Sequence, residues 1–193
     1  GVFLKKEIFE PLGMKDTDFW VPAEKQDRLA KVYDCREGQP SVRYLDNNLG
    51  IQNDMAYRPA YEAGGAGLAS TIDDYAKFTQ MLLNGGAYNG VQILRPATVK
   101  FLGGHTLSAV QQAGFDNWIG LEGFSYGNLM RVLVDPTRAV TLGSKGEFGW
   151  DGWLGCYMEV VPEQNMTFLM MTQKKDAGTY TLSRKIRNII FSE

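Results

Sequence analysis

Hydrophobic and polar residues repeat with two different periods along this chain. In its first half, apolar residues recur at the three- and four-residue spacing that places them on one face of a helix. The clearest run consists of Ile72, Tyr75, Phe78, Met81 and Leu82. From Trp118 onward the pattern is that of β-strands. The sequence therefore predicts an α+β fold, in which helices come first, an antiparallel sheet follows, and a C-terminal helix packs on the sheet.

The predicted helix over this run has recognisable ends. Before it lies the segment 64–71 (GGAGLAST), in which three glycines let the backbone pass close to a ligand or to a neighbouring element. Ser70 or Thr71 is expected to cap the helix, because a hydroxyl oxygen can accept from the free N–H groups of the first turn. Residues 84–86 (NGG) are expected to end it.

Shorter elements are predicted around this helix. A first helix is expected to end near residues 11–13, and because the chain opens as if in the middle of that helix, we expect a segment of a longer protein. Residues 29–33 indicate a short strand. Residues 34–60 are rich in Gly, Pro, Asn and Asp, and indicate a long irregular segment with room for a small hairpin. A short helix is expected over residues 96–102, since proline fits its first turn.

The second half predicts three strands and a final helix. The strands are expected over Phe124–Val134, Phe148–Val161 and Met166–Gln173, with residues 161–165 as a hairpin connection between the last two. The stretch Thr179–Phe191 is predicted to be an amphipathic helix that lays its apolar stripe across the sheet. That stripe comprises Leu182, Ile186, Ile189 and Ile190.

Length and composition narrow the class of protein. The chain has 193 residues, which suits a single domain over residues 1–193. Its net charge is -2 and it has no run of Lys or Arg, so nothing indicates a nucleic-acid partner. Its apolar stretches are shorter than the ~18–20 residues of a membrane span. A lone histidine, His105, argues against a structural zinc site, and Cys35 and Cys156 are expected to be free thiols.

One string matches a catalytic motif but lacks its context. Residues 123–127 (GFSYG) fit the G-x-S-x-G pattern of a nucleophile elbow, yet a strand and not a helix is predicted after them. Ser125 is therefore expected to be a strand residue, and His105 a loop histidine in place of a general base. No serine has a lysine three residues later, so the S-x-x-K pair of activated serine and proton acceptor is absent.

Four stretches in order resemble the penicillin-recognising serine hydrolases, the group of serine β-lactamases and family VIII esterases. They are residues 8–17 (IFEPLGMKDT), 64–86, 118–123 (WIGLEG) and 148–157 (FGWDGWLGCY), the last followed by similar residues at 160–165 and 170–173. The resemblance implies a partial β-lactamase or transpeptidase-like fold, an acyl-enzyme mechanism, and no metal or organic cofactor. It also implies that the catalytic Ser, Lys and Tyr lie upstream of Gly1.

The same resemblance assigns part of a substrate cleft. Residues 150–152 (WDG) fall where β-lactamases have K-T-G and family VIII esterases often have W-G-G, so Trp150, Asp151 and Gly152 would flank the substrate. The backbone N–H of Trp153 would be one donor of the oxyanion hole. Trp150 in place of Lys removes a cation, which favours esters and amides over β-lactams. Asp151 is expected to point outward, because a carboxylate aimed at the site would oppose the developing negative charge. The opposite side of the cleft would be lined by Gly64, Gly65 and Ala66.

The leading hypothesis is the C-terminal segment of a β-lactamase-family serine hydrolase that acts on ester, amide or peptide substrates and is inactive as these 193 residues alone. The alternative is a non-catalytic β-lactamase-like binding module, and a third hypothesis is a self-contained hydrolase using Ser125 and His105. An S-x-x-K motif about 100 residues before Gly1 would separate the first two. Without upstream elements the sheet should have an unpaired edge and an exposed apolar face, so homo-oligomers are expected.

Overall fold

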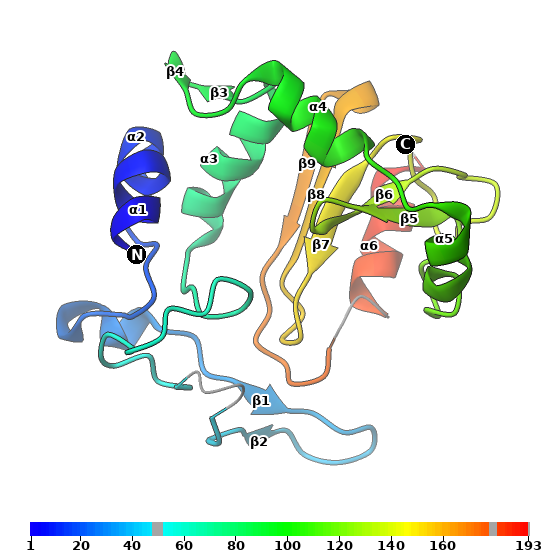
Figure 1. The fold of residues 1–193 in the computed structure, drawn as a ribbon. Coiled ribbons are helices and arrows are strands. Elements are labelled where there is room, and N and C mark those ends of the chain that lie inside the picture. The colour runs from blue at the N-terminus through cyan, green and yellow to red at the C-terminus, as the bar shows by residue number, and fades with distance from the viewer. Residues whose placement is uncertain (48–51, 178–180, 193) are drawn as a thin grey trace.

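A computed structural model describes residues 1–47, 52–177 and 181–192 of the chain. At its centre is an antiparallel sheet of five strands, in which each strand pairs with its neighbours in sequence (Figure 1). The strands are β5 (Phe124–Gly127), β6 (Met130–Leu133), β7 (Phe148–Asp151), β8 (Tyr157–Val161) and β9 (Met166–Met170). Strands β5 and β9 form the two edges of this sheet within the described residues.

Helices precede the sheet and one helix follows it, so the predicted α+β order is confirmed. The chain starts with a continuous helical run that consists of α1 (Val2–Leu4), a wider π-helical turn (Lys5–Phe9) and α2 (Glu10–Leu12). The other helices are α3 (Ile72–Leu83), α4 (Pro96–Gly104), α5 (Ala109–Phe115) and α6 (Leu182–Ile190), and 3-10 turns span Ala23–Arg28 and Pro162–Gln164. Two small hairpins lie outside the main sheet, and they pair β1 (Tyr33–Asp34) with β2 (Val42–Arg43) and β3 (Ala87–Tyr88) with β4 (Val91–Gln92).

The predicted ends of the helices agree with the structure at several positions. Gly13 follows α2 with φ 67°, the left-handed conformation expected there. Of the two candidate caps of α3, Thr71 is the one used, because its hydroxyl oxygen accepts from the Asp74 N–H at 3.2 Å. Asn84 ends α3 as predicted, and α4 continues to Gly104, beyond its predicted end. The predicted C-terminal helix Thr179–Phe191 is longer than α6, because Thr181 and Phe191 are the caps of α6. Residues 179 and 180 of the prediction lie outside the described residues.

Two predicted strands are each a hairpin in the structure. The prediction of one strand over Phe124–Val134 is wrong, because β5 and β6 are antiparallel and are joined by a two-residue turn in which Leu129 has φ 69°. The prediction of one strand over Phe148–Val161 is wrong for the same reason, since β7 and β8 are joined by a tight turn. Asn128 and Gly152 are residues typical of turns, and the long apolar runs around them concealed that signal.

One face of the sheet forms the main hydrophobic core with α3, α4 and the N-terminal helical run (Figure 1). The buried members of this core are Phe9, Leu12, Met14, Met81, Leu82, Val99, Val132, Phe148, Met158 and Val160. Met81 and Val160 are both fully buried, which places α3 directly against β8. The predicted apolar face of α3 is therefore the face that holds the helix on the sheet.

The opposite face of the sheet is covered by α6, and the contact is ionic. Arg187 of α6 is 3% exposed and forms an ion pair at 2.6 Å with Glu147 and a second ion pair with Glu159. Its Nη1 also donates to the Tyr157 hydroxyl at 3.1 Å. Burial and the nearby charge of Glu159 raise the pKa of Glu147 to about 8, against the opposing effect of Arg187.

The predicted orientation of α6 is therefore wrong. Leu182 and Ile189 of the expected apolar stripe are 53% and 64% exposed, whereas Ser183 and Arg187 are buried. The physical reason is that buried carboxylates on the sheet require a cation, and Arg187 is the residue of α6 that supplies it. Association of copies through exposed apolar residues stays a prediction. Among the described residues, no helix combines the length and the apolar character that crossing a membrane would require.

Candidate active site

The strand that was expected to flank the cleft is β7, which carries Trp150 and Asp151 at its end. A three-residue loop joins it to β8, since the Gly152 N–H donates to the Cys156 carbonyl at 2.7 Å and the Gly155 N–H donates to the Gly152 carbonyl at 2.9 Å. Gly155 has φ 84°, the left-handed conformation that such a loop needs at its last position. The WDG segment thus lies where a strand enters a tight turn.

Trp153 is the first residue of this loop, and its backbone groups differ in their partners. Its carbonyl accepts from the Ala177 N–H at 3.2 Å, and the next carbonyl, that of Leu154, accepts from the Lys174 N–H at 3.1 Å. Its indole N–H donates to the Asp176 carboxylate. The segment after β9 therefore fixes the loop. The backbone N–H of Trp153, by contrast, has no hydrogen-bond acceptor within the part of the chain that the structure describes.

Asp151 is two residues before this donor in the sequence, and a buried cation balances its charge. Arg131 of the neighbouring strand β6 donates from Nη1 to Asp151 Oδ1 at 2.6 Å. The Arg131 side chain is 3% exposed, and its guanidinium carbon lies 4.5 Å from the centre of the Tyr157 ring. The Asp151 side chain is itself only 18% exposed. The carboxylate is thus committed to an ion pair inside the sheet, which the expectation of an outward orientation did not include.

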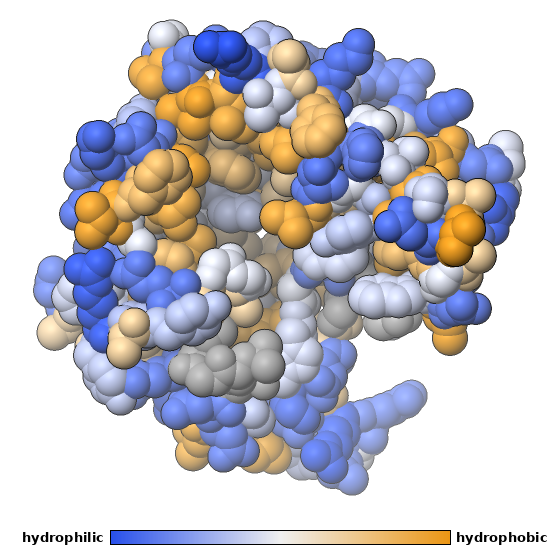
Figure 2. Space-filling model, in the orientation of Figure 1, coloured by the Kyte–Doolittle hydropathy of each residue, from blue (hydrophilic) through white to orange (hydrophobic). Residues whose placement is uncertain are grey.

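Gly64, Gly65 and Ala66 form the exposed tip of a turn that closes where the Gly67 N–H donates to the Ala63 carbonyl at 2.7 Å. Gly67 is buried, and a Cβ at this position would lie 2.8 Å from the Ala63 carbonyl oxygen, so a larger residue would not fit. In Figure 1 this loop runs from the start of α3 toward the end of the sheet where β7 turns into β8. Figure 2 shows that the same face of the molecule is hollowed near its centre.

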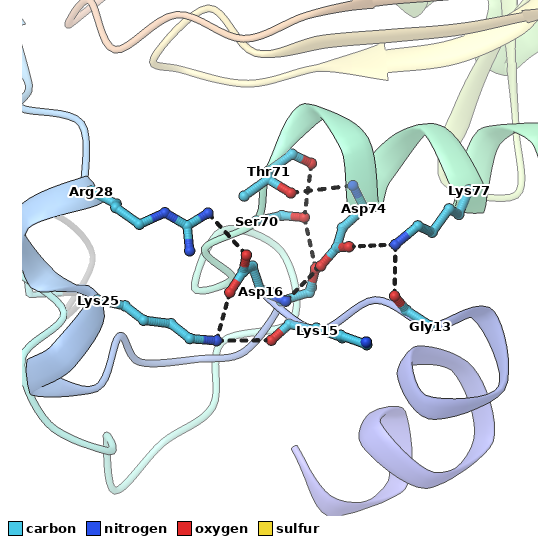
Figure 3. Close-up of polar contacts among 10 residues, drawn as sticks. Gly13, Lys15, Asp16, Lys25, Arg28, Ser70, Thr71, Asp74 and Lys77 are labelled. Carbon is cyan, nitrogen blue, oxygen red and sulfur yellow. Dashed lines mark hydrogen bonds and ion pairs between the residues drawn. The ribbon is translucent and has the colours of Figure 1, made fainter.

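A polar network joins α3 to the segment after the first helical run (Figure 3). The Asp74 carboxylate accepts from the Asp16 N–H at 2.7 Å, from the Thr17 hydroxyl at 3.1 Å and from Lys77 Nζ at 2.9 Å. Lys77 also donates to the Gly13 carbonyl at 2.6 Å. Burial alone would raise the pKa of Asp74, but these hydrogen bonds and the Lys77 charge outweigh it and hold the pKa below its usual value.

The network extends outward through Asp16. Its carboxylate pairs with Arg28 at 2.9 Å and with Lys25 at 2.6 Å, and these two cations lower its pKa to about 2. A pair of backbone hydrogen bonds between Asp18 and Ala69, at 3.2 and 2.9 Å, adds a short bridge. Two of the stretches that carry the family resemblance, residues 8–17 and 64–86, are therefore joined by direct contacts that also fix the root of the glycine-rich loop.

Ser125 lies in β5 and is 2% exposed, so its assignment as a strand residue is confirmed. Its hydroxyl oxygen accepts from the Leu107 N–H at 3.0 Å. The His105 ring lies against Phe101 with 5.3 Å between the ring centres, and no hydrogen bond joins His105 to Ser125 within the described residues. Ser125 has neither the exposure nor the neighbouring base that an activated nucleophile requires.

Two residues that organise this region were missed by the sequence patterns, Arg131 and Asp74. A signal for Arg131 was present, because a cation inside an otherwise apolar run (residues 129–134) must find a buried partner if that run is a strand. No comparable signal existed for Asp74. Its position in the first turn of α3 predicts a favourable charge, but its partners come from a segment 57 and 58 residues away.

Comparison with known proteins agrees with this arrangement. A profile of the Beta-lactamase family matches residues 1–189. Protein Rv1367c of Mycobacterium tuberculosis is 32% identical over 177 residues, which cover 88% of this chain and 42% of that protein. The lovastatin esterase of Penicillium rubens is 30% identical over 156 residues, which cover 79% of this chain and 37% of the esterase. The solved structure of "EstCE1, a hydrolase with promiscuous acyltransferase activity" matches with a TM-score of 0.75 at 23% identity, over 97% of this chain and 49% of that one.

The structural match confirms the expected β-lactamase or transpeptidase-like fold, of which this chain forms a part. The chain spans less than half the length of each of these three proteins. The family match extends over nearly all of the 193 residues, and one of the sequence relatives is named a lovastatin esterase. The chain belongs to the Beta-lactamase family, a family of serine hydrolases.

Proposed function

We propose that residues 1–193 are the C-terminal part of a single β-lactamase-like domain, and that they supply one wall of a serine hydrolase site. In this proposal the nucleophilic Ser, its Lys and the Tyr come from residues outside the 193 described by the sequence. The chain alone does not hydrolyse substrate. Its own contribution is the end of β7, the loop after it, and the glycine-rich turn at residues 64–66.

One observation carries this proposal, the backbone N–H of Trp153. An oxyanion hole needs a donor that is fixed before the reaction and that points to where negative charge develops. Contacts from Ala177 and Lys174 fix the loop through its carbonyl groups, and the Trp153 N–H has no acceptor within the described residues. A donor held in this way loses no hydrogen bond when a carbonyl oxygen of the substrate approaches.

The pairing of Arg131 with Asp151 supports a catalytic use of this loop. An unbalanced carboxylate next to an oxyanion would oppose the transition state by charge repulsion. The ion pair at 2.6 Å neutralises this carboxylate before any substrate arrives. The buried Arg131 would need the same partner in a non-catalytic module. The ion pair therefore supports catalysis only because it removes this charge repulsion.

Trp150 favours esters and amides as substrates. A lysine at this position could hold a substrate carboxylate, whereas the indole of Trp150 offers an apolar surface. Among the proteins compared, one is named a lovastatin esterase and one is described as a hydrolase with promiscuous acyltransferase activity. The proposed reaction is therefore acyl transfer from an ester or amide to the serine, followed by hydrolysis of the acyl-enzyme.

The test removes the backbone N–H of Trp153, and a control variant accounts for the indole that is lost with it. Trp153 is the second residue of the turn from Gly152 to Gly155, and proline is well tolerated at that position of a turn. In a longer product of the same gene, Trp153→Pro is expected to lower kcat by about 10²–10³, the usual effect of losing one oxyanion donor. Trp153→Ala is the matched control, because it loses the indole but keeps the N–H.

The two variants separate the outcomes. If Trp153→Pro and Trp153→Ala lower kcat equally, the indole matters and the backbone donor does not, so the assignment is wrong. If the longer product labels no serine with a fluorophosphonate and hydrolyses no ester, the proposal of a hydrolase is wrong and the binding module takes its place. Fluorescence-detected urea unfolding of both variants shows that the turn still folds.

A further inference from the structure

Four aromatic side chains beside the end of β7 form a closed circuit of ring contacts. Trp150 lies 5.1 Å from Tyr126 and 6.4 Å from Trp118, measured between ring centres. Phe115 closes the circuit, at 5.9 Å from Tyr126 and 6.0 Å from Trp118. The members come from α5, the turn after it, β5 and β7. We call Phe115, Trp118, Tyr126 and Trp150 the aromatic wall.

The aromatic wall is only partly used for packing inside the protein. Trp118 is 57% exposed, and the neighbouring Ile119 is 75% exposed. The contact between α5 and β5 does not depend on Trp118, because Gln112 of α5 donates to the Phe124 carbonyl at 2.9 Å. A large aromatic ring left in water at the border of a proposed substrate site has free surface that a second apolar ring can cover.

The charges near the aromatic wall restrict what it can bind. The guanidinium carbon of Arg131 lies 5.9 Å from the centre of the Trp150 ring. That cation is 3% exposed and already pairs with Asp151, so it cannot reach a substrate carboxylate at the surface. Asp116, which follows Phe115 in the sequence, pairs with Arg138 at 3.7 Å. The wall therefore presents apolar ring surface between ion pairs, which suits an uncharged group.

We propose that the aromatic wall binds the aromatic ring of a neutral ester or amide substrate, and that Trp118 is a specificity-determining residue. This inference rests on the proposed function, since it is that function that places Trp150 and the Trp153 N–H at one reaction site. Rings pair favourably in stacked or edge-to-face geometry, and the aromatic wall offers both orientations: Phe115 and Trp118 are inclined by 17° and Tyr126 and Trp150 by 74°.

The test measures binding to the 193-residue chain itself and needs no turnover. Acetanilide is a neutral amide with an aromatic ring, and N-ethylacetamide is its counterpart without the ring. In ¹H–¹⁵N spectra, the indole signals of Trp118 and Trp150 are expected to shift with acetanilide and to stay in place with N-ethylacetamide. The indole of Trp20, which lies next to residues 18 and 58 in a different part of the surface, is expected not to move.

Variants assign the binding to the aromatic wall. Trp118→Ala is expected to weaken acetanilide binding about 3- to 10-fold, as expected for the loss of one ring contact. Trp118→Phe keeps a ring and should restore most of the affinity, and it serves as the test if Trp118→Ala disturbs the fold. Phe101→Ala is the matched control, because Phe101 is 55% exposed but lies outside the aromatic wall. Equal shifts with both amides, or shifts at Trp20 alone, would overturn the inference.

Kinetics distinguish this inference from the proposed function. In the longer gene product, Trp118→Ala is expected to lower kcat/KM for phenyl acetate about 3- to 10-fold and to leave that for ethyl acetate unchanged. If Trp118→Ala lowers kcat/KM for both esters by the same small factor, or for neither, the aromatic wall does not bind the substrate ring. The proposed hydrolase function is unaffected by that result. If neither ester is hydrolysed while acetanilide still binds, the proposed function is at fault and the aromatic wall is a binding surface only.

Discussion

The two faces of the sheet are held by opposite kinds of interaction. On one face, Met81 and Leu82 of α3 bury apolar surface against Val160. On the other face, Arg187 of α6 is held by two carboxylates, Glu147 and Glu159, and all three side chains are at most 3% exposed. An apolar contact can persist when a helix shifts slightly on the sheet. A buried ion pair cannot, because a charge that loses its partner in the interior raises the free energy of the folded state. The C-terminal helix is thus docked in a single orientation by electrostatics.

The comparison also explains which parts of the fold could be predicted. The apolar face of α3 follows from the spacing of residues along one helix and was predicted correctly. Its cap was predicted as Ser70 or Thr71, and the structure uses Thr71. The ion pairs on the other face join Glu147, the residue before β7, and Glu159 of β8 to Arg187 of α6, and no local sequence pattern indicates this pairing. The apolar spacing of Leu182 and Ile189 therefore predicted the wrong orientation for α6.

The largest loss of stability is expected from removing Arg187, which pairs with the buried carboxylates between α6 and the sheet. Arg187→Leu leaves the buried Glu159 without its cation and the buried Glu147 without a hydrogen-bond donor, so the free energy of unfolding at pH 7 should fall by about 3–5 kcal/mol. Urea unfolding measures this loss. Lys185→Leu is the matched control on the exposed side of the same helix, with an expected change within about 0.5 kcal/mol. Equal effects of the two variants would mean that α6 is not docked through Arg187.

A smaller loss of stability is expected from a change in the apolar core between α3 and the sheet. Met81→Ala creates a cavity at a fully buried position and should lower the free energy of unfolding by about 2–5 kcal/mol. The loss should be the same at pH 5 and pH 8, because no charge is involved. The loss in Arg187→Leu should be smaller at pH 5, where a carboxylate can become neutral. A pH-dependent loss in Met81→Ala would contradict this division between the faces.

The pH dependence of stability sharpens the comparison further. Glu147 has a pKa of about 8 in the folded chain against an ordinary value of 4.5, so the folded state holds a proton that the unfolded chain releases between these values. Stability should therefore fall as pH rises from about 5 to about 8, by at most about 1.4 kcal/mol per pH unit for one proton. Glu147→Gln should remove this slope. An unchanged slope in Glu147→Gln would show that another group is responsible.

The smallest effect is expected at the start of α3. Thr71→Ala removes the cap hydrogen bond to the Asp74 N–H and should cost about 1 kcal/mol in urea unfolding. Thr71→Ser keeps a hydroxyl and should recover most of that loss. A loss above the range of a cap would mean that the network around Asp74 depends on Thr71 as well.

In the candidate site, too, features carried by neighbouring residues could be predicted from the sequence, whereas contacts between distant residues could not. The WDG segment and the glycine-rich turn became candidates through the family resemblance of residues 148–157 and 64–86, and their role in a site stays a prediction. The ion pair of Arg131 with Asp151 and the contacts that fix Trp153 were not found, since they join strands and segments that are distant in sequence. The turns at Asn128 and Gly152 were missed for a different reason: each lies inside an apolar run that also fits one long strand.

The central claim is that this chain carries a wall of the hydrolase site but not its nucleophile. Intact-mass analysis of the 193-residue chain after incubation with a fluorophosphonate tests it most directly. We expect no adduct, because Ser125 is buried and the chain has no S-x-x-K pair. A stoichiometric adduct that maps to Ser125 would contradict the account and would make the G-x-S-x-G string the true nucleophile.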